Sequence, residues 1–329
     1  MPTINISVVI ATRNRVRLLV SCLEAFLHQD YDKSFFEIIV INDGSSDGTL
    51  AFLTQFKKNT DLNFQFVSHD NSGVSHSRNI GISLGRGEYT AFTDDDCIVP
   101  NDWLSRIAGL WNNAGPAVAA IGGPLDSPPG NNYVTHYIHF LDEFNFIPLL
   151  GKYWITPVHV SKLPDNAPVA YLRTSNAVFR KSCLLEVGGF DVNFKKPGGE
   201  DPDLCYRMLK QGYRFHFDKK LVVLHNGRES MGSYFRSLNN YIASEFRKKA
   251  KILSYPDKVR SSYFLIPARK TAALFLSIVT APVTMLNLLY RSPNSFFEGL
   301  SFPILLIVSK CYALCISINY QVRYFLNII

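Results

Sequence analysis

The chain contains 329 residues, of which 47% are hydrophobic and 19% are charged, and its formal net charge is +7. This hydrophobic content excludes an intrinsically disordered chain, and the length suffices for one sizeable α/β domain with an accessory region. The six cysteines lie far apart without CxxC spacing, which argues against a zinc site and against a disulfide framework and indicates a reducing compartment.

Short apolar runs alternate with amphipathic stretches over the first hundred residues, which predicts βαβ units on a mainly parallel sheet. The expected strands are Ile4–Ile10, Phe35–Ile41, Phe64–Val67 and Tyr89–Thr93, and the expected helices are Arg15–His28, Asp47–Lys58 and Val74–Leu84. A turn-rich break at Gly122–Gly130 precedes a further strand, Val169–Phe179, a helix from Pro202 to Gln211 and a strand from Tyr213 to His225.

Polar clusters follow three of the predicted strands, at Ala11–Asn14, Asn42–Ser46 and Asp94–Asp96. Ligands of such sheets bind at the carboxyl ends of the strands. Three adjacent carboxylates repel one another, but at the mouth of a cleft they suit a hard divalent cation together with substrate phosphates. The alternative is a solvated acidic turn.

Four motifs in order resemble the family 2 inverting glycosyltransferases of the GT-A fold, a Rossmann-like, mainly parallel sheet with flanking helices. They are SVVIATRNR, EIIVINDGSSDGT, NSGVSHSRNIGISLGRGEYTAFTDDDC and GGFDVNFKKPGGEDPDLCYRMLKQGYRFHFDKKLVVLH. The resemblance covers roughly Ile4 to His225. It implies a catalytic domain over residues 1–228.

The resemblance implies a donor site at the first strand ends. Asp43 would hold the nucleotide base by accepting an imide N–H, although NDGS is also a good turn string. Thr12 and Arg13 would line the same pocket. Arg78 would reach the base or the phosphates, or would be a charge on a helix surface.

The same resemblance assigns the acidic triplet to a site for Mg²⁺ or Mn²⁺. Asp96 is the expected metal ligand, and Asp94 would meet the ribose or a metal-bound water, or contribute to the metal site. Asp95 would contribute to donor binding. His225 would complete the metal site or contact the diphosphate, because imidazole suits Mn²⁺; a structural histidine is the alternative.

Glu200 and Asp201 match the family's ED motif, in which one carboxylate is the general base. We assign the base to Asp201, with Glu200 as the second candidate, since inversion needs a base opposite the leaving diphosphate. Asp201 before Pro202 is also an ideal N-cap, and capping would lower its pKa.

Two uncharged or nearly uncharged stretches follow, Thr271–Tyr290 and Gly299–Val322, the second with only Lys310. Each is long enough to span a bilayer, and in-plane helices or buried helices of a soluble domain are the alternatives. We expect a basic linker over 229–262 and C-terminal hydrophobic helices over 263–329. Basic residues between Arg236 and Lys270 fit an anionic membrane surface better than a nucleic acid.

The sequence therefore predicts an inverting enzyme that moves one sugar from a nucleotide-diphosphate-sugar to a hydroxyl of a glycan or polyprenyl-linked acceptor, in surface polysaccharide synthesis. The start, MPTINISVVI, shows no secretory signal, so the catalytic domain should face the cytoplasm from the inner membrane. The rivals are a processive polysaccharide synthase, for which a QxxRW segment is missing, and a non-catalytic nucleotide-binding protein. A dehydrogenase would need GxGxxG where ATRNR stands.

Overall fold

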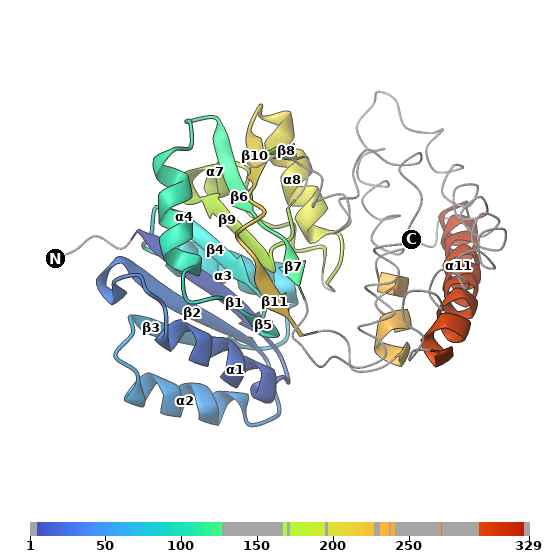
Figure 1. Cartoon of the computed structure of the whole chain (residues 1–329), viewed down its shortest axis with the longest axis horizontal. Helices are drawn as coiled ribbons and strands as arrows, with labels where there is room; N and C mark the ends of the chain where they lie inside the picture. The colour runs from blue at the N-terminus through green and yellow to red at the C-terminus, as the bar shows by residue number, and fades with distance from the viewer. Residues whose placement is uncertain are drawn as a thin grey trace. The chain divides into compact units, whose positions relative to one another are not determined.

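The computed structural model describes residues 5–126, 167–169, 172–194, 197–226, 231–236, 238–240, 271 and 296–325. The chain divides into two compact units, one of Met1–Pro129 with His159–Asn226 and one of Gly130–Val158 with Gly227–Ile329 (Figure 1).

The larger sheet of the first unit contains eight strands in the order β3-β2-β1-β4-β9-β6-β10-β8. They are β1 (Ile6–Thr12), β2 (Phe36–Asp43), β3 (Phe64–His69), β4 (Tyr89–Thr93), β6 (Val118–Gly122), β8 (Ala167–Val169), β9 (Asn176–Arg180) and β10 (Arg214–Phe217). Strands β3, β2, β1 and β4 run parallel to one another, and β10 runs parallel to β6. Strand β9 is antiparallel to both its neighbours, and β8 is antiparallel to β10. The expected α/β sheet is thus confirmed as a mixed, mostly parallel one.

A second sheet has the order β5-β11-β7, with β5 at Cys97–Ile98, β7 at Leu125–Asp126 and β11 at Val223–His225. The single strand expected from Tyr213 to His225 is therefore wrong, because it is divided between the two sheets. Asp218 ends β10 by accepting hydrogen bonds from the backbone N–H groups of Lys220 and Leu221. The expected strand Val169–Phe179 is likewise divided between β8 and β9.

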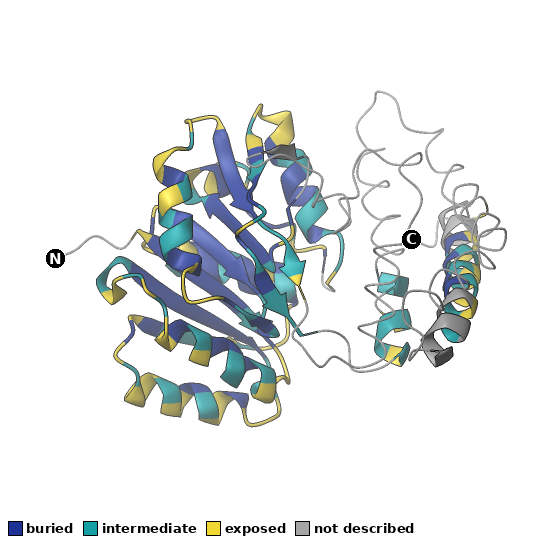
Figure 2. Ribbon diagram, viewed as in Figure 1, coloured by how far each residue is buried: buried dark blue, intermediate teal, exposed yellow. Residues whose placement is uncertain are grey.

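Helices cover both faces of the larger sheet, which is why its strands β1, β2, β4, β6 and β9 are buried almost throughout (Figure 2). They are α1 (Val16–Leu27), the 3₁₀ turn η1 (Lys33–Phe35), α2 (Thr49–Asn59), α3 (Val74–Leu84), α4 (Trp103–Asn112), α7 (Lys181–Glu186) and α8 (Glu200–Lys210). Trp103 of α4 packs edge-on against Phe26 of α1 at 6.1 Å between ring centroids. The expected helix Val74–Leu84 is confirmed to the residue.

Helix α3 lies unusually close to β1, at Gly81. A Cβ atom at this position would lie 2.2 Å from Cγ1 of Val9, so only glycine permits this approach. The close contact fixes the height of α3 over the sheet, and Arg78 stands one turn earlier on that helix. The close packing of α3 against β1 therefore helps to set the position of the Arg78 side chain.

The second unit contains α11, which runs from Phe296 to Phe325. Within the described part of the chain, no helix meets the length and apolarity that crossing a membrane demands. The prediction that Gly299–Val322 spans a bilayer is corrected accordingly: these residues belong to α11, and Lys310 near its middle would be costly in lipid. Apart from Thr271, the stretch Thr271–Tyr290 lies outside the described residues.

Candidate active site

The parallel strands β1, β2 and β4 end beside one another, so their last residues lie together at the carboxyl ends of these strands. Thr12 at the end of β1 pairs in register with Asn42, and Asp43 follows at the end of β2. Strand β4, on the other side of β1, ends one residue before Asp94. The polar residues that the sequence places at the ends of these strands therefore lie close together in space.

The three carboxylates of the triplet face different partners. Asp94 accepts a hydrogen bond from Nη2 of Arg78 at 3.1 Å, and Ser175 donates to its other oxygen. Asp95 is buried and accepts from the Thr12 hydroxyl at 2.7 Å. Burial raises the pKa of Asp95 to about 6, although the nearby charge of Arg15 opposes that shift. Asp95 is thus turned into the protein, whereas Asp94 is partly exposed.

Asp96 faces His225, which the second sheet brings opposite it. Cys97 of β5 pairs in register with His225 of β11, and Oδ1 of Asp96 lies 3.3 Å from Nε2 of the histidine. Burial would raise the pKa of Asp96, but His225 and Arg15 together hold it below its usual value. Burial would lower the pKa of His225, and Asp96 raises it instead. Each side chain therefore favours the charged form of the other.

These residues fit a divalent cation. Oδ1 of Asp96 is buried without a hydrogen-bond partner, and ligand atoms of Asp96, Cys97 and His225 lie within 4.8 Å of one another. Carboxylate and imidazole are ligands that Mn²⁺ accepts. Burial raises the pKa of the Cys97 thiol well above its ordinary value, so Cys97 is a poor ligand for a hard metal.

The ED motif begins α8. The N-cap of the helix is Gly199, with φ at 105°, and no side chain caps it, so the interpretation of Asp201 as N-cap is wrong. The carboxylate of Asp201 instead accepts from the backbone N–H and the hydroxyl of Thr174, at 3.1 and 2.9 Å. Burial and the neighbouring charge of Glu200 raise the pKa of Asp201 to about 7, against the opposing charge of Arg78. The shift is opposite to the one that capping predicts.

Arg78 joins the two acidic motifs. Its guanidinium donates to Glu200 at 2.9 Å, to Asp201 at 3.4 Å and to Asp94 at 3.1 Å, and the side chain is 6% exposed. Burial opposes its charge, but Asp201, Asp94 and Glu200 raise the pKa of Arg78 above its ordinary value. The interpretation of Arg78 as a helix-surface charge is therefore wrong.

Asp43 is buried, and its carboxylate reaches across to the start of α3. It accepts from the backbone N–H groups of Ser72 and Gly73, at 2.7 and 3.1 Å. The turn after β2 is closed by Asn42 instead, whose side-chain oxygen accepts from the N–H of Ser45 at 3.2 Å. The turn-forming role proposed for Asp43 thus belongs to its neighbour. Arg13 is exposed beside Thr12.

Sequence reasoning misses three residues of this cluster: Arg15, Thr174 and Ser175. Arg15 stands at the N-cap position of α1, where a basic residue is ordinarily read as a surface charge. Thr174 and Ser175 precede β9, which runs antiparallel to β4, so this strand begins where β4 ends. The polar pair TS before an apolar strand is the only sequence signal for them.

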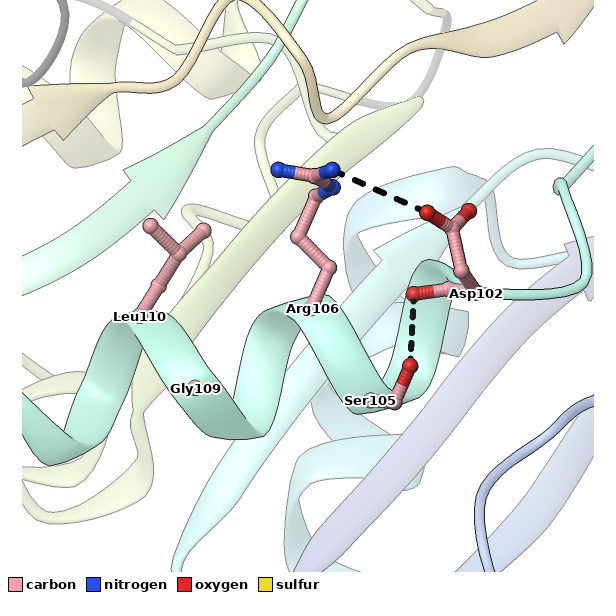
Figure 3. Close-up of a pocket in the computed structure, with 5 residues that line it drawn as sticks. All are labelled: Asp102, Ser105, Arg106, Gly109 and Leu110. Carbon is pink, nitrogen blue, oxygen red and sulfur yellow. Dashed lines mark hydrogen bonds and ion pairs between the residues drawn. The ribbon is translucent and has the colours of Figure 1, made fainter.

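A separate hollow of about 360 Å³ lies on α4, and its described lining residues are Asp102, Ser105, Arg106, Gly109 and Leu110 (Figure 3). Arg106 and Asp102 form an ion pair of 3.7 Å across one helical turn. None of these lining residues belongs to the acidic cluster, so we do not place the chemistry there.

The chain is similar to several known glycosyltransferases. Residues 7–186 match the family model described as Glycosyl transferase family 2. Glycosyltransferase AglE of Haloferax volcanii is 29% identical over 225 residues, which are 68% of this chain and 67% of that protein. The glucosyl-dolichyl phosphate glucuronosyltransferase of the same organism is 26% identical over 229 residues, covering 67% of this chain and 68% of that protein.

Two solved structures share the fold. The mannosyltransferase PcManGT from Pyrobaculum calidifontis, in complex with GDP-Man and Mn²⁺, has a TM-score of 0.63 at 17% identity and covers 97% of this chain and 88% of its own. S. aureus TarS 1-349 in complex with UDP-GlcNAc has a TM-score of 0.55 at 15% identity, with 98% and 92% covered. The expected GT-A-like fold is confirmed. Because the family model covers more than half of the chain, this protein belongs to glycosyl transferase family 2 and transfers a sugar from a nucleotide-sugar donor.

Proposed function

We propose that this protein is a metal-dependent, inverting glycosyltransferase that adds a single sugar to an acceptor hydroxyl. The observation that carries the proposal is the position of Arg78, which contacts Asp94 of the triplet together with Glu200 and Asp201 of the ED motif. Acidic groups more than a hundred positions apart in the chain thereby share one site. A donor diphosphate at the triplet and an acceptor at the ED motif would then face each other.

Asp201 is the proposed general base. A base works best when its pKa lies near the working pH, and the pKa of Asp201 is raised to about 7. Thr174 fixes the orientation of the carboxylate through two hydrogen bonds. Glu200 is held at one oxygen by Arg78 and at the other by the N–H of Gly198, at 2.9 and 2.7 Å. Because the pKa of Asp201 is raised, we assign removal of the acceptor proton to Asp201 and a positioning role to Glu200.

Asp96 and His225 are the proposed protein ligands of Mg²⁺ or Mn²⁺, with Asp94 beside them. When bound, the cation would neutralise charge on the departing diphosphate. PcManGT binds Mn²⁺ together with GDP-Man, which supports this assignment by likeness of fold. Asp94 keeps its carboxylate at the open edge of the sheet, where Arg78 and Ser175 orient it.

The nucleotide of the donor is proposed to lie along the ends of β1 and β2. Thr12 and Arg13 stand at the end of β1, and Asp43 holds the loop that starts α3. Similar structures hold GDP-Man and UDP-GlcNAc, so likeness of fold does not choose the base. A screen of nucleotide sugars by thermal shift, with and without Mn²⁺, identifies the donor.

The acceptor is proposed to be a glycan or a polyprenyl-linked sugar, used at the cytoplasmic face of the membrane in surface polysaccharide synthesis. One relative is named for a dolichyl phosphate substrate, and α11 exposes Ile304, Val308 and Ile318. Such a helix can lie in the interface of a membrane. Flotation of the full chain with anionic vesicles tests this location: replacement of Ile304 and Ile318 by Gln should release the protein, and failure of the parent chain to float would contradict it.

Substitution of Asp201 by Asn tests the catalytic assignment. With the donor found by the screen, Asp201→Asn should abolish transfer while donor binding, followed by thermal shift, is kept. Asp102→Asn, a matched change of an exposed carboxylate at the N-cap of α4, should leave transfer unchanged. Full transfer by Asp201→Asn would refute the assignment of the base, and long products from one acceptor would favour a processive synthase.

A further inference from the structure

Arg15 connects two carboxylates of the triplet. Its Nη1 atom lies 3.0 Å from Oδ1 of Asp95 and 2.8 Å from Oδ2 of Asp96. The residue stands between β1 and α1, where the chain leaves the sheet edge. The proposed metal ligand Asp96 therefore shares its charge with a protein cation at one oxygen and with His225 at the other.

Arg15 and Arg78 differ in their freedom to move. The side chain of Arg15 is 50% exposed, whereas that of Arg78 is 6% exposed and is held by Asp94, Glu200 and Asp201. Moving Arg78 would leave buried charges without a partner, which is costly. Turning Arg15 into solvent hydrates its half-exposed guanidinium, and the buried Asp95 keeps its hydrogen bond from the Thr12 hydroxyl.

A divalent cation on Asp96 would stand next to the Arg15 guanidinium, and like charges at contact distance repel. The cation must therefore displace or weaken the Arg15 contact with Asp96. The donor diphosphate changes this balance, because its oxygens offer the guanidinium a new anionic partner of suitable shape.

We infer that Arg15 is an internal counter-ion that competes with the divalent cation for Asp96 and transfers its contact to the donor diphosphate. This inference rests on the proposed function, since it takes Asp96 as a metal ligand. It follows that the cation binds weakly to the enzyme alone and more tightly together with the donor. By thermodynamic linkage, the cation must strengthen diphosphate binding by the same factor.

Direct titration of the full chain with Mn²⁺ alone, with free Mn²⁺ followed by electron paramagnetic resonance, tests the competition without any turnover. Arg15→Gln should bind Mn²⁺ on the order of tenfold tighter than the parent. Arg15→Lys keeps the charge but lacks the planar guanidinium, so its Mn²⁺ affinity should lie between those of the parent and Arg15→Gln. Arg17→Gln removes the same charge from an exposed position two residues away and should match the parent.

A second titration, with uridine or guanosine diphosphate present according to which one binds, measures the coupling. The parent should gain Mn²⁺ affinity when the nucleotide is added, and Arg15→Gln should gain less. Equal or weaker Mn²⁺ binding by both Arg15 variants, with measurable binding by the parent, overturns the inference and leaves the proposed function standing. Failure of every protein to bind Mn²⁺, with and without nucleotide, overturns both.

Discussion

Removal of the Arg78 charge is the most direct test of how the site is built. In Arg78→Met, the carboxylates of Asp94, Glu200 and Asp201 lose the guanidinium that they share at 2.9 to 3.4 Å. Breaking a buried ion pair from one side costs about 3–5 kcal/mol, because the remaining charge is left without a partner. We expect a loss of stability in this range at pH 8.

The loss should depend on pH in one direction. The pKa of Asp201 is already raised to about 7, and Arg78 is the charge that restrains it. Without Arg78 that pKa rises further, so the folded variant takes up a proton more readily than the unfolded chain does. Relative to the parent, the part of the loss that comes from Asp201 is fully present above the raised pKa of the variant. It disappears as the pH falls below about 7, where Asp201 of the folded parent takes up its proton as well.

Urea unfolding at pH 8 and pH 5.5 measures both effects, with tryptophan fluorescence as the signal, to which the buried Trp103 and Trp111 contribute. Lys33→Met is the control, because its pair with Asp61 is exposed on both sides and is worth about 0–1 kcal/mol. A loss below about 1 kcal/mol for Arg78→Met, equal at the two pH values, would show that Arg78 does not hold the acidic motifs together.

Three further predictions concern the base, the metal and the packing of α3. The kcat/KM of the parent should rise with pH through about 7 as Asp201 loses its proton, and a profile flat from pH 5 to pH 9 would contradict a base at this position. His225→Ala should weaken Mn²⁺ binding by about tenfold or more in calorimetry, and unchanged affinity would remove His225 from the ligand set. Gly81→Ala should cost about 1–3 kcal/mol in urea unfolding, since its methyl group meets Val9 at 2.2 Å, and a more stable variant would contradict that packing.

The periodicity of apolar residues was sufficient to predict the strands and helices in the first half of the catalytic unit. Strands β1 to β4 and helices α1 to α3 lie where apolar runs and amphipathic stretches predict them, because each contains enough residues to show its period. Periodicity failed for Tyr213–His225, where two short strands of different sheets follow one another in an apolar stretch. Their separation depends on hydrogen bonds to Asp218, which hydrophobicity does not report.

The candidate site, too, could be predicted only in part from the sequence. The order and chemistry of the motifs indicated the acidic triplet and the ED pair, since both match the family pattern at the expected places in the chain. The sequence could not choose between a base and a helix cap for Asp201, because either role uses the same residue beside Pro202. The structure decided it through Gly199, which takes the cap position.

The amino-acid sequence by itself determined the α/β class, the family and the chemical types at the sheet edge, because these follow from local patterns and from residues fixed in order along the chain. Tertiary structure alone decided which charges meet. Arg15, before α1, and Arg78, in α3, are ordinary basic residues in the sequence, and their roles arise only when packing brings them against carboxylates that are 16 to 123 positions away. Coulomb interactions depend on distance in space, and the fold sets that distance.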